Sequence, residues 1–323
     1  MMLSRRSLLP LAALLLSPTL TMAQDFPKQM VRMIVPYPAG GGVDGLARAV
    51  ADSLGRKWGQ SVIIDNRPGA STMIGGEYVA RAPADGTPLL FTSDSSITSN
   101  PFLFRKMSFD PIKDLAPITQ LADLHQMVLV HPSVQANTLQ ELVALAKAKP
   151  GALNYASYGN GSQPHLLFEA LKKQADIQIV QVPFRGIAPA LQAVIAGDVQ
   201  MTLGGPAALG MLEAKQLKAL AIGRKQRLPA LPDVPTLAEA GYPEVDPLSW
   251  FGLFAPATTP PAIIDRIQKD VAATMADPDF NKRFVAGLGF TGVASTPQAF
   301  AQFIKDDLAI KERLIATSGA TVE

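Results

Sequence analysis

Six consecutive positions near the start of the chain, Gly40-Gly41-Gly42-Val43-Asp44-Gly45, satisfy the G-x-G-x-x-G pattern of a turn that holds the pyrophosphate of a dinucleotide. An apolar run at 31–35 precedes these glycines, and an amphipathic pattern follows them. Asp65 closes the next apolar run, near the distance at which a dinucleotide-binding fold places its ribose ligand. The spacing therefore predicts an anion-binding turn between a strand and a helix, and NAD is one possible ligand of this turn.

A second glycine-rich turn, "YASYGNGSQPH" from Tyr155 to His165, repeats this design in the other half of the chain. In each turn the carboxyl end of a strand meets the amino end of a helix, where several backbone N–H groups have no partner and the helix dipole presents partial positive charge. Such a turn holds an anion without Lys or Arg. A single glycine-rich turn of this kind commonly joins a strand to a helix without binding a ligand. The presence of two such turns, one in each half of the chain, favours a ligand site.

The individual side chains near these turns each allow a structural and a functional interpretation. Asp44 suits helix capping as well as ligand contact, and His165 suits capping or packing as well as ligand contact. Thr92 and Ser93 follow a strand, where their hydroxyls serve either a ligand or a turn. Tyr37 and Trp250 suit the walls of a cleft or hinge packing, and Arg185 suits an anion contact or a solvated cation. The alternating charges of "KDDLAIKER" at 305–313 predict a solvated helix face.

The first 23 residues have the features of a secretory signal peptide. Arg5 and Arg6 precede an almost wholly apolar stretch from Leu8 to Leu16, and Thr21-Met22-Ala23 predicts cleavage after Ala23. The apolar stretch is well short of the roughly 20 residues that span a bilayer. The arginine pair also resembles a twin-arginine signal, so either export route stays open.

Composition excludes several classes of function. Loss of Arg5 and Arg6 with the signal peptide reduces 29 basic residues to 27, against 27 acidic ones, so nothing indicates binding to nucleic acid or to a membrane surface. The chain has no Cys, which excludes disulfides, thiolate catalysis and zinc-thiolate sites. Three His make a histidine-rich metal site improbable, and we expect no catalytic residue, metal ligand or cofactor.

The remaining chain alternates short β-branched runs with longer helical patterns, which predicts an α/β architecture with largely parallel sheets. Its length favours two domains. The expected strands are 31–35, 61–64, 89–92, 127–130, 154–156, 177–182, 201–203, 219–222 and 250–254. The expected helices are 46–54, 139–149, 165–174, 187–196, 262–275, 278–286 and 297–317.

Several long motifs occur in order along residues 28–318, among them "VRMIVPYPAGGGVDGLAR", "IIDNRPGAS", "ADGTPLLF", "YASYGNGSQPH", "VPFRGIAPALQAVIAGDVQM" and "LPDVPTLAEAGYP". In these motifs the chain resembles the Bug family, the TctC-type solute receptors of tripartite tricarboxylate transporters. The resemblance implies a two-lobed type II periplasmic binding protein fold, α/β, in which each lobe is a mostly parallel sheet flanked by helices and two crossovers join the lobes. It implies lobes of 24–124 with 248–293 and of 125–247 with 294–323, and hinges near Leu124 to Val130 and Pro247 to Phe254.

The resemblance also implies a function without turnover: capture of a small organic carboxylate by hinge closure, in a periplasmic monomer that delivers it to a membrane permease or a sensor domain. No nucleic acid is expected as a partner. The implied ligand-binding residues of the first lobe are Tyr37, Pro38, Ala39, Gly40, Gly41 and Asp44, with Thr92 and Ser93 added from the strand end. Those of the second lobe are Ser157, Gly159, Gly161, Ser162, His165, Gly186, Ala188, Pro189 and Gly204.

The chain departs from the family pattern at three places. Gly204-Gly205 stands where relatives carry a polar pair, and we expect this loss of side chains to enlarge the pocket. Ser71-Thr72-Met73 replaces a glycine-rich continuation, and Gln181 stands where His is usual. The alternative function, from a different class, is an exported oxidoreductase that binds a dinucleotide at Gly40–Gly45. A serine hydrolase is a poorer alternative still, because no G-x-S-x-G elbow occurs.

Overall fold

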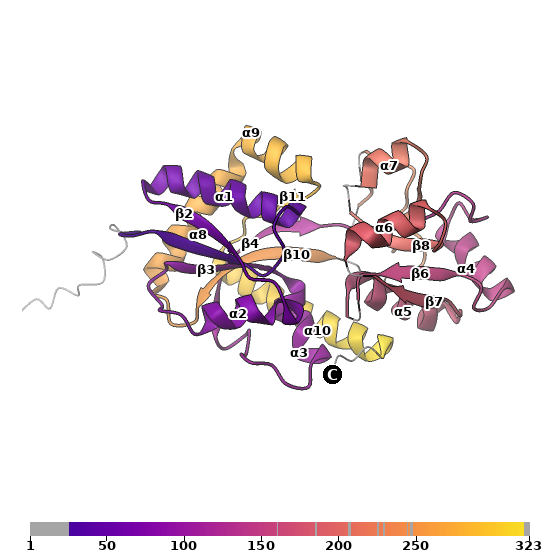
Figure 1. Cartoon of the computed structure of the whole chain (residues 1–323), viewed down its shortest axis with the longest axis horizontal. Coiled ribbons are helices and arrows are strands. Elements are labelled where there is room, and N and C mark those ends of the chain that lie inside the picture. Colours follow the sequence, from indigo (N-terminus) through magenta and orange to yellow (C-terminus); the bar gives the residue numbers. More distant parts are fainter. Residues whose placement is uncertain are drawn as a thin grey trace, which may run out of the picture.

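The computed structural model describes residues 26–319 apart from positions 160, 185, 206, 207, 225, 229, 244, 246 and 247. The predicted signal peptide and Arg185 lie outside these described residues. The described chain forms two α/β lobes, each built around one sheet (Figure 1). Within the described residues, no helix has both the length and the apolar character needed to cross a membrane.

The first lobe contains a six-stranded sheet in the order β11-β4-β10-β3-β1-β2. β1 is parallel to β2 and β3, whereas β10 is antiparallel to β3 and β4, and β11 is antiparallel to β4. The strands are β1 Val31–Val35, β2 Val62–Asn66, β3 Pro88–Ser93, β4 Leu115–Leu124, β10 Ser249–Pro256 and β11 Thr291–Gly292.

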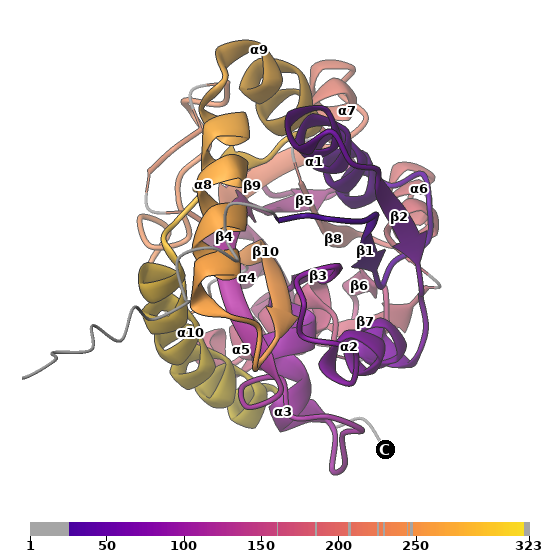
Figure 2. The same cartoon turned by 90° about the vertical axis from the view of Figure 1, so that its left-hand side faces the viewer.

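Helices cover both faces of this sheet (Figure 2). α1 and α8 cover one face, where Leu46, Val50 and Ile267 are fully buried, and α2 and the start of α10 cover the other. The helices of this lobe are α1 Gly42–Trp58, α2 Met73–Ala80, α3 Asn100–Leu103, α8 Pro261–Ala276 and α9 Pro278–Phe280, with a 3-10 turn at Ala70–Thr72 and at Ala286–Leu288 and a π-helical turn at Ser95–Ser99 and at Asn281–Val285.

The second lobe contains a five-stranded sheet in the order β7-β6-β8-β5-β9. β6 is parallel to β7 and β8, and β5 is antiparallel to β8 and β9. The strands are β5 Met127–Val130, β6 Asn154–Ser157, β7 Val180–Pro183, β8 Met201–Gly204 and β9 Lys218–Ile222; the helices are α4 Leu139–Ala148, α5 Gln163–Ala175, α6 Ile187–Ile195 and α7 Leu209–Glu213.

Both sheets are therefore mixed, and the prediction of mostly parallel sheets was wrong in this respect. The reason lies in the crossovers. β10 enters the first sheet from the second lobe, so it runs against β3 and β4, which end towards that lobe. β5 enters the second sheet from the first lobe and likewise runs against its neighbours.

The C-terminal helix α10, Pro297–Ser318, contacts both lobes. Phe300 and Ile304 near its start pack with Trp250 and Phe254 of the first sheet. Leu314 and Ile315 near its end belong to the core of the second lobe. The helix thus crosses the boundary of the predicted domain division, which placed all of 294–323 in the second lobe.

Candidate functional site

The first glycine turn connects β1 to α1 and leaves its backbone open. Residues 39–42 are exposed, and a Cβ added at Gly40, Gly41 or Gly42 would meet no atom within 4 Å. Gly40 has a φ of +90°, which favours glycine. Among the described residues, no side chain caps α1 at Gly41. The turn therefore exposes amide groups at the positive end of a helix of 17 residues, which suits an anion.

Asp44 holds this turn in place. Its Oδ2 accepts hydrogen bonds from the Gly40 amide at 2.9 Å and from Arg48 Nε at 2.8 Å, and its Oδ1 accepts from Arg48 Nη2 at 3.1 Å and Asn66 Nδ2 at 2.9 Å. Burial raises the pKa of Asp44, but the bonds from Arg48, Gly40 and Asn66 outweigh it, so the pKa lies below its usual value. The four bonds use the acceptor capacity of the carboxylate, which favours the capping interpretation.

A network of hydroxyl groups lies beside the first turn, at the end of β3. The Tyr37 hydroxyl donates to Ser93 Oγ at 2.7 Å, accepts from the Ser93 amide at 3.1 Å and lies 3.5 Å from Thr92 Oγ1. Thr92 contacts Ser96, whose hydroxyl donates to Thr72 Oγ1 at 2.6 Å. Burial raises the pKa of Tyr37. The structure thus brings the predicted residues Tyr37, Thr92 and Ser93 together.

The turn from Ala70 to Thr72 carries backbone strain that sequence reasoning missed. Ala70, Ser71 and Thr72 have φ values of +44°, +50° and +76°, in a region that residues with a side chain seldom adopt. Asn100 Nδ2 donates to the Ser71 carbonyl at 2.7 Å, and this bond, with that from Ser96 to Thr72, holds the turn.

The second glycine turn connects β6 to α5. Gly159 and Gly161 have φ values of +119° and +75°, and Ser162 Oγ donates to the Gly159 carbonyl at 2.6 Å. Ser157 Oγ, at the end of β6, accepts from Gln181 Nε2 at 2.7 Å. A Cβ at Gly161 would lie 2.7 Å from Leu103 Cδ1, a side chain of the first lobe. The second turn therefore lies against the first lobe.

His165 has the same place in the second turn that Asp44 has in the first. The Gly161 amide donates to His165 Nδ1 at 3.0 Å, so this nitrogen carries no proton and the capping interpretation is favoured. Burial lowers the pKa of His165 below its usual value. In both turns the third residue of the helix accepts the amide of a glycine four positions earlier. One acceptor is a carboxylate and the other is a neutral imidazole.

The segment after β7 opens a third helix start at the same edge of the second sheet. β7 neighbours β6, so the start of α6 lies beside the second glycine turn. Gly186 has a φ of +117° and open space at its Cβ position, and Ala188 and Pro189 are exposed. The predicted residues of this segment therefore lie next to those of the second turn.

Gly204 does not enlarge a pocket, and that prediction was wrong. A Cβ at Gly204 would lie 2.4 Å from Leu129 Cδ1, and a Cβ at Gly205 would lie 3.2 Å from Leu124 Cδ1. The space that side chains would occupy at these two positions is already filled by the leucines. Gly204 is buried in β8 and belongs to the packing of the second sheet.

A buried cluster of charged residues, here called the junction cluster, joins the lobes; it consists of Asp94, Asp307 and Lys311. Lys311 Nζ lies 2.9 Å from Asp94 Oδ2, and these side chains are 2% and 0% exposed. Thr98 Oγ1 and Trp250 Nε1 donate to Asp307 Oδ2 at 2.6 and 2.8 Å. Burial raises the pKa of Asp307. Most of 305–313 is exposed, as expected of a solvated helix face, but Asp307 and Lys311 are buried and depart from that expectation. Trp250, fully buried, is part of the core.

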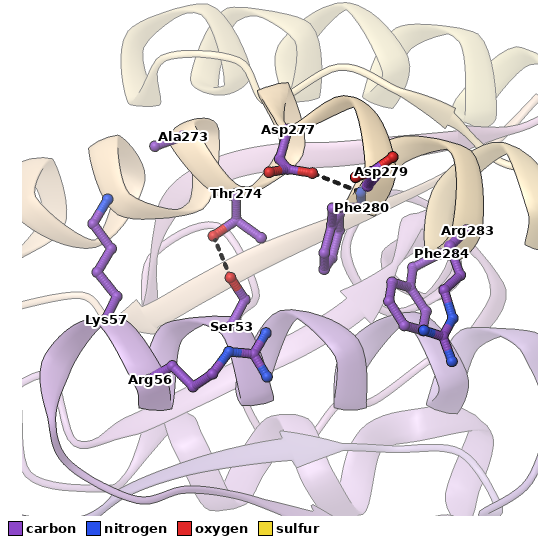
Figure 3. A pocket seen from close by; sticks show the side chains of 10 residues that line it. All are labelled: Ser53, Arg56, Lys57, Ala273, Thr274, Asp277, Asp279, Phe280, Arg283 and Phe284. Carbon is purple, nitrogen blue, oxygen red and sulfur yellow. Dashed lines mark hydrogen bonds between the residues drawn. The ribbon is translucent and has the colours of Figure 1, made fainter.

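A cavity of about 400 Å³ lies elsewhere, between α1 and the segment from α8 to Phe284 (Figure 3). Ser53 Oγ and Thr274 Oγ1 are 2.9 Å apart across it, and Lys57 is paired with Asp270 at 2.8 Å. Ser53 lies three helical turns beyond Gly42, about 16 Å along α1 at 1.5 Å per residue. The cavity is therefore separate from the glycine turns.

Two α/β lobes, joined by crossovers and each carrying a glycine turn at a helix start, define a periplasmic binding protein fold. Residues 46–320 match the family described as "Tripartite tricarboxylate transporter family receptor", TctC. The chain belongs to this family of receptors.

Curated relatives of similar length support this assignment. The chain is 33% identical to protein BugT of Bordetella pertussis over 306 residues, which cover 93% of each chain. It is 32% identical to a protein encoded in the tcbD-tcbE intergenic region of Pseudomonas sp. strain P51, over 96% of this chain and 94% of that one.

Solved structures of related proteins have the same fold as this chain. Rhodopseudomonas palustris Rpa4515 with adipate is 32% identical, with a TM-score of 0.83 over 92% of this chain and 99% of that one. MatC of the same organism, with bound malate, is 28% identical, with a TM-score of 0.78 over 90% and 100%. The relatives are solute receptors and not enzymes, and this chain is likewise a receptor. In agreement, Asp65 is paired with Arg67 at 2.9 Å and Arg32 at 3.5 Å and is not presented to the first turn as a ribose ligand.

Proposed function

We propose that this receptor captures a small organic carboxylate between its two glycine turns by closure of the lobes, and delivers it to the permease of a tripartite tricarboxylate-type transporter. The observation that carries the proposal is the matched construction of the turns: each is a glycine turn at a helix start in which a glycine amide donates to a side chain four residues later, Gly40 to Asp44 and Gly161 to His165. Rpa4515 with adipate and MatC with malate support the chemical class of the ligand.

Backbone groups supply the attraction in this scheme. Arg48, the cation beside the first turn, is engaged by Asp44 and Asn66. Amides at a helix start stabilise an anion through direct hydrogen bonds and the helix dipole. Asp44 and His165 shape the turns in this proposal, and the exposed Gly40 and Gly41 and the half-buried Gly159 receive the ligand.

Closure follows from the two-lobed construction. We assign the lobes as 24–124 with 248–293 and 125–247 with 294–323, with α10 bridging them, and place the hinges at the crossovers near 124–130 and 247–254. A ligand that contacts both turns binds the closed form more tightly and shifts the population towards it. The protein acts as a periplasmic monomer after removal of residues 1–23.

Substitution of Gly41 by Asp tests the site. Gly41 has an extended backbone, φ −81° and ψ 168°, and open space at its Cβ position, so Asp fits without strain. Asp is a favourable N-cap, so Gly41→Asp keeps or raises stability while its carboxylate occupies the amides and repels an anion. We expect the affinity for the best carboxylate to fall at least about tenfold, which corresponds to about 1.4 kcal/mol.

Gly210→Asp is the matched control, because Gly210 also has open space at its Cβ position. The substitution adds the same charge, but in α7. Malate, adipate, citrate, benzoate and NAD would first be screened by thermal shift, since a ligand of the folded state raises the melting temperature. Calorimetry would then compare the variants. Equal affinity in Gly41→Asp and the wild type, or stabilisation by NAD alone, would refute the proposal.

A further inference from the structure

Asp94, at the end of β3, is the point where four segments of the chain meet. Its Oδ2 accepts from Gln163 Nε2 at 2.6 Å and lies 2.9 Å from Lys311 Nζ, and its Oδ1 accepts from Ser249 Oγ at 2.6 Å. These partners belong to α5 of the second lobe, to α10 and to the crossover strand β10. One fully buried carboxylate therefore holds the second lobe to the first.

We propose that Gln163 is a positioning residue for ligand binding: through Asp94 it fixes the second glycine turn against the first lobe. The inference rests on the proposed function, because the position of that turn matters only if both turns hold one ligand. Gln163 is the first residue of α5 and directly follows Ser162 of the turn. Its contact is made behind the turn, so it acts without touching the ligand.

Within the part of the chain that the structure describes, the side-chain amide of Gln163 has Asp94 as its hydrogen-bond partner. Gln163 is 6% exposed, and within the described residues its Oε1 has no hydrogen-bond partner. Rotation of the amide by half a turn would place Oε1 against the Asp94 carboxylate, which accepts hydrogen bonds and cannot donate one when ionised. An orphaned buried oxygen is unfavourable, so local packing and solvation do not explain why this residue is polar. The bond to Asp94 does.

Asp94 cannot follow Gln163 when the lobes separate. Ser249 of β10 holds its carboxylate in the first lobe, Lys311 of the bridging helix α10 pairs with it, and hydrogen bonds to a charged, buried acceptor are among the stronger ones. Separation of α5 from β3 therefore breaks the hydrogen bond from Gln163 Nε2 to Asp94 Oδ2.

The same segment of the first lobe makes a second contact with the turn. Leu103, nine residues after Asp94, packs where a Gly161 side chain would be, with its Cδ1 2.7 Å from that Cβ position. Leu103 belongs to the buried core of the second lobe together with Leu166 and Phe168 of α5. Asp94 and Leu103 thus hold the turn on both sides of Ser162, by a polar bond to Gln163 and an apolar contact with Gly161.

The test replaces Gln163 by Met, which keeps the length of the side chain and removes the donor. Gln140→Met is the matched control, because Gln140 Nε2 also donates, to the Ala240 carbonyl at 3.0 Å, but within the second lobe. Small-angle scattering would give the radius of gyration of each protein with and without ligand. Calorimetry and stopped-flow would give the affinity and the dissociation rate for the carboxylate with the largest thermal shift.

In Gln163→Met we expect a larger radius of gyration without ligand, an unchanged one at saturation, and a dissociation rate raised about tenfold, as for loss of one hydrogen bond to a charged group. Gln140→Met should match the wild type in all three measurements. Equal radii and equal affinities for Gln163→Met and the wild type would overturn the inference, and so would equal losses in both variants. If the wild-type protein binds none of the carboxylates, the proposed function is refuted. The radius of gyration without ligand is measured in the absence of any carboxylate, so its comparison between Gln163→Met and the wild type still decides the inference.

Discussion

Gly204→Ala tests whether the glycine pair at the end of β8 serves packing. The added Cβ would lie 2.4 Å from Leu129 Cδ1, about 1.2 Å inside ordinary carbon contact. Leu129 is fully buried in β5, next to β8 in the sheet, so the leucine or the strand must shift. Overpacking of this kind costs about 1–3 kcal/mol. Urea denaturation should therefore show a lower free energy of unfolding by this amount, with an unchanged slope.

Two controls make this result specific. Gly210→Ala adds the same methyl group in open space within α7 and should be neutral or stabilising by up to about 1 kcal/mol. In a Leu129→Ala background the clashing Cδ1 is gone, so Gly204→Ala should become close to neutral, and the two effects should be strongly non-additive. A Gly204→Ala protein as stable as the wild type but with weaker ligand binding would refute the reasoning and restore the enlarged pocket.

Three further predictions concern buried charges and pH. Lys311→Met should lower the free energy of unfolding by about 3–5 kcal/mol, because it leaves Asp94 buried without its cation; adding Asp94→Asn should recover part of this loss in urea denaturation. Asp307 has a raised pKa, so its ionisation opposes folding as the pH rises above the unfolded value of about 4. Asp307→Asn keeps an acceptor for Trp250, and its stability relative to the wild type should increase between pH 4 and the folded pKa; an unchanged difference in melts across this range would contradict the assignment. His165 has a lowered pKa, so the wild type should lose stability as the pH falls below about 6.5, and His165→Gln should lose less between pH 7 and pH 5; equal slopes would mean that the imidazole does not titrate in this window.

Local sequence patterns predicted most of the elements, because each pattern reports a short-range preference. The β-branched runs that end in glycine turns, such as 31–35 and 154–156, form β1 and β6. β4, the longest strand of the described chain, was missed because Pro117, Gln120 and Asp123 interrupt its apolar pattern. Its pairing with β10 depends on residues about 130 positions further along, which no local pattern contains.

The candidate site was likewise predictable where it depends on local patterns, and not where it depends on contacts between distant residues. The glycine turns follow from strand, glycine and helix signals, whereas the roles of Asp44 and His165 depend on which amide each side chain reaches. The junction cluster had no local signal. Alternating charges on α10 are typical of a solvated face, and only the distant Asp94 shows that Lys311 is an exception.

The position of β10 has a consequence for the order in which the chain can fold. The strand lies between β3 and β4, so the first sheet stays divided until residues 249–256 have been made, although four of its six strands, β1 to β4, lie within residues 31–124. All strands of the second sheet, in contrast, come from the continuous stretch 127–222. Contacts between distant segments form slowly, and unpaired strand edges favour association with other chains. During synthesis from the N-terminus, the lobe that begins first is therefore completed last, with the edges of β3 and β4 open until β10 closes them.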